Sequence, residues 1–545
     1  MTIQMKKAEW EGGTPVKRRS MALLLCVCML FSCTACQTDQ ETLYSQAMSQ
    51  QEEQSMTEPS IDPNDPGYLG LGTPAPEDRL TPIPNDEMKG EIVVKLYQQK
   101  SWDANIQTLA REFMLLHPQV TVTIDYEMGY YERLNLTQQE QNIQRESFYT
   151  ELRTKLVSGE ADYLLFDCGD GLNLTSLSLN GVLEDLSPYL ENEATFSENN
   201  FYMPVVDAFQ VEGKQTLIPM SFTWYQIYFD RNLLEKIGID PMELQSVTTL
   251  QVLDWYDLLR NSYPQLRLFY SGPGKDEMFP LERTAYIDLE AGISKFDSPE
   301  FVDFLARTTQ VLNDEPNLNP EWVGKGTLGL ADDALMYQAT GELDSVAQFW
   351  QNSNKLYDEL MTEVMPYFAF VDISTPNRGL MITQQPLDYL AGPYLLTNSK
   401  GEAGIMAYDC FAMPTSMKNK DLAWEFIKYC MNEREDTRFN QDGYSWDYTD
   451  YIPISKANWK QIVERVSSGI GISGSMATAP NTFNGIDVDA VMNELESVVS
   501  NPLIPVDYYN VDVQDYLDEF YKNGLTTAEE CAQKIQGRAE IWLNE

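Results

Sequence analysis

Four short segments of this 545-residue chain carry aromatic side chains, Asp residues or both. Aromatic rings can cover an apolar face of a ligand, and carboxylates can accept its hydrogen bonds. This is the chemistry of reversible binding of a small molecule. We expect the ligand contacts to come from Trp102, Asp103, Asp167, Asp170, Phe222, Trp224, Tyr225, Tyr444 and Trp446.

The aspartates among these residues also have purely structural roles open to them. Asp103 could only cap the helix that follows it, since Asp is a favoured N-cap residue. Asp167 and Asp170 lie on either side of Gly169, and Asp near Gly is common in turns. Both interpretations stay open from the sequence alone.

The aromatic residues have structural alternatives as well, because large aromatic side chains often fill cores. Trp102 could pack over the start of a helix. Trp224 and Tyr225 lie beside a predicted strand, so we expect one of the two in the core. Alternating residues Tyr444, Trp446 and Tyr448 could form a strand face that shields the core from solvent.

The sequence offers little for catalysis. His117 is its one histidine, and its position before a predicted strand is typical of a loop residue. We find no GxSxG or HExxH motif and no His/Cys cluster with metal-ligand spacing, so we expect no catalytic residue, no metal and no cofactor. The many Asp and Glu residues leave one enzymatic alternative open, a secreted carbohydrate-active enzyme with paired carboxylates.

Around the candidate segments, the apolar pattern alternates between strand and helix periods. Glu91–Tyr97, Val120–Ile124 and Tyr163–Phe166 are predicted strands, and residues 106–113 repeat at helical spacing. Further strands are expected at Leu217–Pro219 and Tyr225–Phe229, and further helices at Tyr149–Leu156, Asn232–Ile237, Leu422–Cys430 and Thr527–Leu543. This alternation predicts an α/β fold with ligands at the carboxyl ends of its strands.

The charge of the chain excludes some partners. With 83 acidic and 38 basic residues, the formal net charge is −45. Such a surface repels nucleic-acid phosphates and anionic lipid headgroups, so we expect no nucleic-acid partner and no electrostatic attachment to a membrane. The same charge would suit a cationic ligand, although net charge reports on solubility as readily.

The first 36 residues have the pattern of a secretory signal. Basic Lys17–Arg19 precede the apolar run Met21–Phe31, which is too short to span a bilayer. The segment resembles a bacterial lipoprotein signal, which implies lipidation of Cys36, with Cys33 as the alternative. Residues 37–88 contain seven prolines and few apolar side chains, which predicts a disordered acidic tether. The resemblance implies a chain anchored outside the cytoplasm through acyl groups such as palmitate.

Four cysteines follow the predicted lipidation site: Cys168, Cys410, Cys430 and Cys531. Their spacing contains no CxxC and fits neither a dense disulfide framework nor a zinc ribbon. One disulfide or four buried thiols remain open from the sequence.

Five segments, in order, resemble the extracellular solute-binding proteins of ABC importers, of the maltose and multiple-sugar type. They are Ala110–Val122, Leu156–Phe166, Leu217–Ile239, Phe411–Ile427 and Ile452–Lys456. The resemblance implies a two-lobed periplasmic-binding-protein-like fold with a hinge and an interlobe cleft. It places one lobe at 89–215 plus about 403–440, and the other at about 216–402 plus 441–545, with insertions near 260–290 and 460–500.

The resemblance also implies a function. Ligand would bind in the cleft, and the chain would act as a monomer that delivers it to the permease subunits of an ABC transporter. A sugar is the expected ligand, because it has apolar ring faces and a rim of hydroxyls. The alternatives are a peptide or cationic solute, and a surface binder or sensor that delivers nothing to a transporter.

Overall fold

The structure is a computed structural model and describes residues 82–98, 104–129, 135–167, 171–262, 267–269, 273–313, 368–374, 390–431, 451–467, 487–521 and 524–544. All of them belong to one compact unit, Thr73–Glu545. The predicted signal segment, Cys33, Cys36 and the tether up to residue 81 lie outside the described residues. Within those residues, no helix combines the length and the apolar character needed to cross a membrane.

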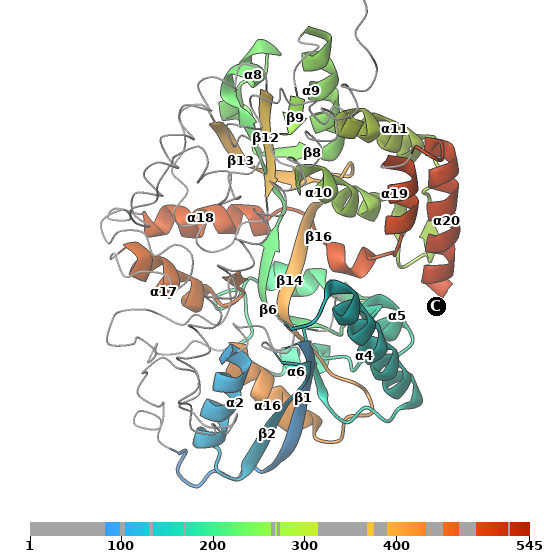
Figure 1. Ribbon diagram of the computed structural model, residues 1–545. Helices are drawn as coiled ribbons and strands as arrows, with labels where there is room; N and C mark the ends of the chain where they lie inside the picture. The colour runs from blue at the N-terminus through green and yellow to red at the C-terminus, as the bar shows by residue number, and fades with distance from the viewer. Residues whose placement is uncertain are drawn as a thin grey trace, which may run out of the picture. The chain divides into compact units, whose positions relative to one another are not determined.

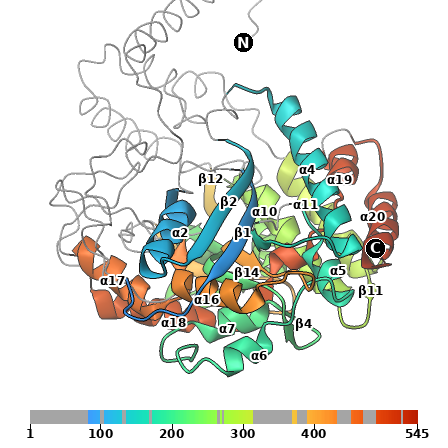
Figure 2. The same ribbon diagram turned by 90° about the horizontal axis from the view of Figure 1, so that it is seen from below.

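The first sheet strands form as predicted. β1 (Gly90–Gln98) pairs in parallel with β2 (Val120–Met128) on one side and with β3 (Leu164–Phe166) on the other. Helix α2 (Ala104–Leu116) connects β1 to β2 and packs with α16 (Lys420–Met431) beside these strands (Figure 2). Parallel strands joined by a helix are the unit of an α/β fold.

Helix α4 (Gln138–Ser158) is defined at both ends by its sequence. Thr137 and Glu140 form a capping box at its start. At its end Gly159 takes the left-handed conformation, with φ 72°, as the predicted helix stop at this glycine requires. The predicted helix from Tyr149 is therefore confirmed. It begins eleven residues before Tyr149, and its apolar pattern misses this first part because none of residues 139–147 is fully buried.

Two long antiparallel strands form the middle of the sheet. They are β6 (Ile218–Trp224) and β14 (Ala403–Ala412), and we call them the crossing strands. The main path of the sheet is β2-β1-β3-β14-β13-β7-β12-β9. The remaining strands of this path are β7 (Gln226–Asp230), β9 (Arg267–Phe269), β12 (Phe368–Ser374) and β13 (Leu390–Thr397); β8 (Ser246–Thr248), β15 (Ile452–Pro453) and β16 (Leu503–Pro505) pair beside it.

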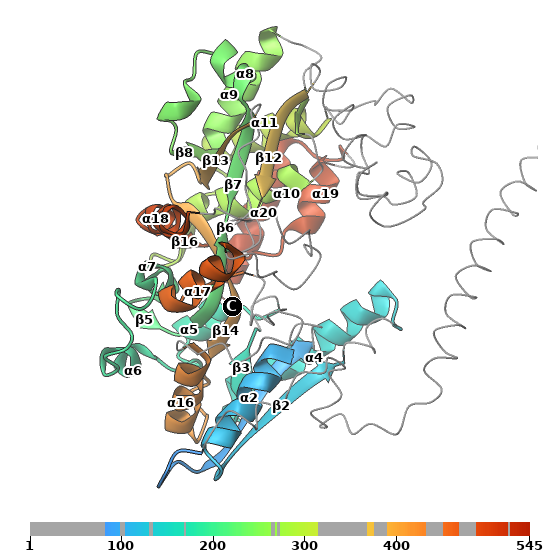
Figure 3. The ribbon, with the colours of Figure 1, turned by 90° about the vertical axis from the view of Figure 1, so that its left-hand side faces the viewer.

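The buried apolar residues form two hydrophobic clusters, and the crossing strands run from one to the other. Trp224 belongs to the first cluster and the next residue, Tyr225, to the second. On β14, Ala403 and Ile405 belong to the first cluster, and Met406, on the opposite face of the strand, packs against the second. In Figures 1 and 3, β1 and β2 lie beyond one end of the crossing strands, and β7, β12 and β13 lie beyond the other. The predicted α/β class is confirmed.

Helices cover both clusters. On the first are α5 (Leu174–Leu179), α6 (Ser187–Glu191), α7 (Met203–Ala208), α16, α17 (Lys456–Ser467) and α18 (Val488–Val499). On the second are α8 (Arg231–Lys236), α9 (Thr249–Ser262), α10 (Pro273–Glu282), α11 (Pro299–Asn313), α19 (Gln514–Tyr521) and α20 (Ala528–Asn544). The predicted helices at 232–237, 422–430 and 527–543 correspond to α8, α16 and α20.

The predicted lobe boundaries stay a prediction. The two hydrophobic clusters divide the chain somewhat differently from the predicted lobes. Residues Leu217–Trp224, predicted in the second lobe, contribute to the first cluster. So do Ile452, Trp459 and Leu495 from the predicted second-lobe segment 441–545. The final part of that segment, from Val511 to the end of α20, contributes to the second cluster.

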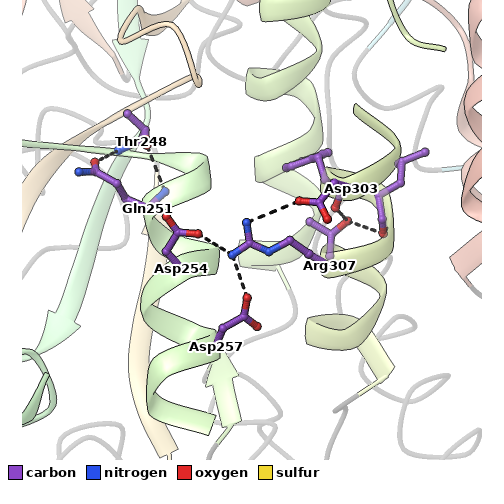
Figure 4. A network of polar contacts seen from close by, with 9 residues as sticks. Thr248, Gln251, Asp254, Asp257, Asp303 and Arg307 are labelled. Atoms are coloured by element: carbon purple, nitrogen blue, oxygen red, sulfur yellow. Dashed lines mark hydrogen bonds and ion pairs between the residues drawn. The ribbon is translucent and has the colours of Figure 1, made fainter. Parts of the chain in front are cut away.

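One arginine connects two helices of the second cluster (Figure 4). Arg307 on α11 donates hydrogen bonds to Asp254 and Asp257 on α9, at 2.7 and 2.9 Å. Its other terminal nitrogen lies 3.8 Å from Asp303 on its own helix. Because several carboxylates share one mostly buried guanidinium, this cation is fully compensated.

Three cysteines and the one histidine are buried. Cys410, Cys430 and Cys531 form no disulfide, and burial raises the pKa of Cys531 to about 12. Cys168 lies outside the described residues. His117 lies in the loop between α2 and β2, as predicted, and is held there: its Nδ1 lies 2.9 Å from a carboxylate oxygen of Asp86 and its ring packs against Phe113. The end of the predicted tether therefore already contacts the folded body.

The turn between β13 and β14 is held to the end of α10 by buried polar groups. The Glu282 carboxylate accepts hydrogen bonds from the Ser399 N–H, at 2.9 Å, and from the Thr249 hydroxyl. Asn398 donates to the Thr284 hydroxyl at 2.9 Å. Burial raises the pKa of the Glu282 carboxyl above its usual value, because the charged form loses its hydration.

Glu282→Gln is expected to raise the melting temperature at pH 8 and to leave it unchanged at pH 4. A carboxyl whose pKa is raised on folding stabilises the fold below its unfolded pKa, and this contribution is lost as pH rises through the folded value. Thermal unfolding of both proteins from pH 4 to pH 8 measures the effect. Glu140→Gln is the control of opposite sign, because hydrogen bonds from Thr137 lower the pKa of Glu140. An equal difference at both pH values would contradict the prediction for Glu282.

Candidate functional site

The two faces of crossing strand β6 differ in chemistry although the whole strand is buried. Phe222 and Trp224 point to one face and belong to the first hydrophobic cluster. Ser221 and Thr223 alternate with them and so lie on the opposite face. A row of polar side chains on a fully buried strand is more informative than a buried apolar row, because burying polar groups carries a cost.

Two tyrosines meet over this polar face. Tyr408 on β14 is the register partner of Ser221. Tyr451 precedes β15, whose Ile452 pairs with Phe222, so Tyr451 falls beside Thr223. Register partners share a face, and the two tyrosine rings stack with centroids 3.7 Å apart and planes inclined by 14°. Both tyrosines are only partly buried, so the pair is an aromatic surface at the middle of the sheet.

Two aspartates flank the aromatic pair, both with left-handed backbone. Asp409, next to Tyr408, has φ 52°, and its carboxylate accepts from the Ser221 hydroxyl at 3.4 Å. Asp167, at the end of β3, has φ 50°, and its N–H donates to the Cys410 carbonyl at 2.9 Å. A residue with a side chain pays about 1–2 kcal/mol for this conformation, so such residues cluster where function requires them.

The arrangement suits binding better than catalysis. An aromatic surface with adjacent carboxylates can stack against a ring and accept hydrogen bonds from its hydroxyls. Among the described residues, no group of His, Cys, Asp and Glu could hold a metal ion. A surface hollow of about 460 Å³ lies elsewhere, at Thr526, Glu530, Gln533 and Lys534 near α20. We take the crossing strands rather than this hollow as the candidate binding site, because no aromatic side chain lines the hollow.

The structure places four of the nine predicted site residues. Asp167 follows β3, where it was predicted. Phe222, Trp224 and Tyr225 are 0%, 2% and 4% exposed. Phe222 and Trp224 belong to the first cluster and Tyr225 to the second. Both Trp224 and Tyr225 are therefore in the core, where only one of the two was expected. Their contact with a ligand stays a prediction.

The other five predicted residues lie outside the described residues: Trp102, Asp103, Asp170, Tyr444 and Trp446. Whether these five residues contact a ligand stays a prediction.

Sequence reasoning missed Tyr408, Asp409 and Tyr451. Tyr408 and Asp409 lie just before Phe411–Pro414, a segment quoted for the resemblance, and Tyr451 lies just before Ile452. Nothing in the local pattern separates these residues from core aromatics. The signal that could have found them is the pairing of β14 with β6, which depends on tertiary structure.

No model of a protein family matches the chain, and no curated protein matches it. Among solved structures, it is similar to an extracellular solute-binding protein family 1 from Alicyclobacillus acidocaldarius, at 12% identity and a TM-score of 0.45, over 85% of this chain and 100% of that chain. It is similar to the maltose-bound MalE3 of T. maritima, at 14% identity and 0.44, over 83% and 99%. It is also similar to the sugar-binding protein MalE of Xanthomonas citri, at 13% identity and 0.46, over 84% and 98%. At these values the likeness carries no argument about this chain's site or ligand.

Proposed function

We propose that this chain binds an extracellular solute, a sugar or oligosaccharide, and delivers it to the permease subunits of an ABC transporter. One observation carries the proposal: Tyr408 and Asp409 lie on crossing strand β14, between two hydrophobic clusters, with Tyr451 stacked on Tyr408 and Asp167 beside the same strand. A few strands that connect two separately packed bodies can act as a hinge. Closure around a ligand is then movement of one body toward the other.

In this proposal the chain works outside the cytoplasm, attached to the membrane by the lipid on Cys36 alone, and acts as a monomer. The predicted tether would give the folded body room to reach a permease. Binding rather than turnover is favoured, because the aromatic pair has carboxylates beside it but no histidine. The one His is paired with Asp86 in another part of the unit.

A second candidate function is the capture of a cationic solute. Asp167 and Asp409 favour it, because a positive group beside two carboxylates gains both charge and hydrogen-bond energy. The stacked tyrosines would suit it too, since aromatic faces attract cations. We favour the sugar because ring stacking and hydroxyl recognition use the polar strand face as well.

Thermal-shift measurements across neutral sugars, acidic sugars, peptides and polyamines separate these candidates. We expect an oligosaccharide to raise the melting temperature and to shift tryptophan fluorescence. We also expect small-angle scattering to show a smaller radius of gyration at saturation, because the two bodies close. Stabilisation by polyamines and by no sugar would reject the sugar. Release of products from a stabilising oligosaccharide would reject binding without catalysis.

A further inference from the structure

Arg283 is a buried cation with no ion-pair partner among the described residues. It begins the short 3-10 helix Arg283–Tyr286 directly after α10, and 8% of its surface is exposed. Within the described part of the chain it has no ion pair within 4.0 Å, and its buried Nε has no hydrogen-bond partner. Arg307, by contrast, has three carboxylates around it.

An unpartnered buried guanidinium is costly, because the charge has lost its hydration and gained nothing in exchange. Burial lowers the pKa of Arg283 to about 10, against a weaker opposite effect of Tyr225 and Asp507. Asp507 does not form an ion pair with Arg283, and its carboxylate accepts the Ala407 N–H at 3.1 Å. A charge retained at such a cost would gain most from an anionic ligand that pairs with it.

Arg283 lies near Tyr225, at the second-cluster end of the crossing strands. Tyr225 follows β6 in the alternation Ser221, Thr223, Tyr225, and its N–H faces the Gly404 carbonyl. A side chain on Gly404 would meet Tyr225 and Leu281, and Leu281 is two residues before Arg283. Arg283 therefore sits near the Tyr225 end of this row of residues, in the field of Tyr225.

We propose that Arg283 binds an anionic group of the solute, a carboxylate or a phosphate, at the second-cluster end of the face that carries Tyr408 and Tyr451. This inference rests on the proposed function and specifies its ligand as an acidic sugar. Arginine is suited to the task, because its planar fork matches carboxylate and phosphate oxygens in pairs.

The distance along the strand favours a ligand longer than a single ring. Tyr225 is four residues from Ser221, which is about 13 Å at the usual rise of a strand. A solute that stacks on Tyr408 and reaches Arg283 must cover a comparable length. The strongly negative charge of the chain repels an acidic solute. In this proposal the positive charge of Arg283 offsets that repulsion at the site, so that an acidic sugar can bind.

Arg283→Met tests the inference in the full-length protein, with Arg307→Met as the matched control. We expect Arg283→Met to keep or raise the melting temperature of the free protein, because it removes an uncompensated charge. Arg307→Met should lower it, because three aspartates lose their common partner. Calorimetry then compares uronate-containing oligosaccharides with neutral oligosaccharides of equal length. We expect Arg283→Met to weaken uronate binding at least tenfold and to leave neutral-sugar binding within about threefold.

A third ligand set, sugar phosphates with inorganic phosphate alone, identifies the source of the anion. Tighter binding of sugar phosphates than of uronates, lost in Arg283→Met, supports the inference with phosphate as the group. Arg283→Lys should restore part of the affinity, since it keeps the charge without the fork. Equal uronate and sugar-phosphate affinities in wild type and Arg283→Met would overturn the inference and leave the proposed function intact. So would a fall in melting temperature as large as that of Arg307→Met. Failure of every sugar to bind the wild type would overturn both.

Discussion

Tyr408→Ala is expected to weaken solute binding by about 10- to 100-fold, the cost of removing a central aromatic contact. Tyr408 supplies one ring of the stacked pair. Its loss removes the ring that stacks on Tyr451, with ring centroids 3.7 Å apart. The polar face of β6 at Ser221 would lose its cover as well. Titration calorimetry with the best-stabilising oligosaccharide measures the change in affinity.

Two control variants separate a loss of binding from a loss of folding. Tyr408→Phe keeps the ring and should bind within about threefold of wild type, because stacking does not use the hydroxyl. Tyr189→Ala removes another partly buried tyrosine, which contacts Trp424 with centroids 5.3 Å apart. It should lower stability without changing affinity. If Tyr408→Ala binds as tightly as wild type, the crossing strands do not carry the site.

The elements of this fold could be predicted where a local signal coincides with the core. β1 alternates, α16 repeats every three to four residues, and α4 ends at a glycine with φ 72°. Each signal acts within a few residues, so the sequence shows it directly. The early start of α4 could not be predicted, because its first turns are exposed and depend on a capping box rather than on apolar spacing.

The candidate site could be predicted only in part, because it depends on which strands become neighbours. Asp167 was found because it follows a short buried strand. Phe222 and Trp224 were singled out for their aromatic side chains, but both belong to the apolar face of β6. The candidate site lies on the polar face of the same strand. Tyr408 contributes to it although it is 187 residues after Ser221 in the chain, and the Ser221 hydroxyl donates a hydrogen bond to the Tyr408 carbonyl. No local spacing encodes that pairing.

The second large effect is expected at Gly404, where β14 passes between three side chains. A Cβ at this position would lie 2.6 Å from Leu281 Cδ1, 2.9 Å from Val506 Cγ2 and 3.0 Å from Tyr225 Cδ2. These contacts are shorter than van der Waals distances, and the three side chains come from different parts of the chain. Gly404→Ala should therefore destabilise the protein by about 1–3 kcal/mol, the usual cost of overpacking. Denaturant unfolding measures the loss.

Gly537→Ala is the matched control, because Gly537 lies in α20 with no atom within 4 Å of an added Cβ. Alanine is the better helix former, so this variant should gain about 0.5–1 kcal/mol. The same substitution is thus expected to have opposite signs at the two positions. Gly404 faces second-cluster residues while its neighbours Ala403 and Ile405 belong to the first cluster, so filling that space should resist movement between the clusters. A Gly404→Ala protein as stable as wild type would mean that Leu281, Val506 and Tyr225 can yield, and that the crossing strands are not tightly held there.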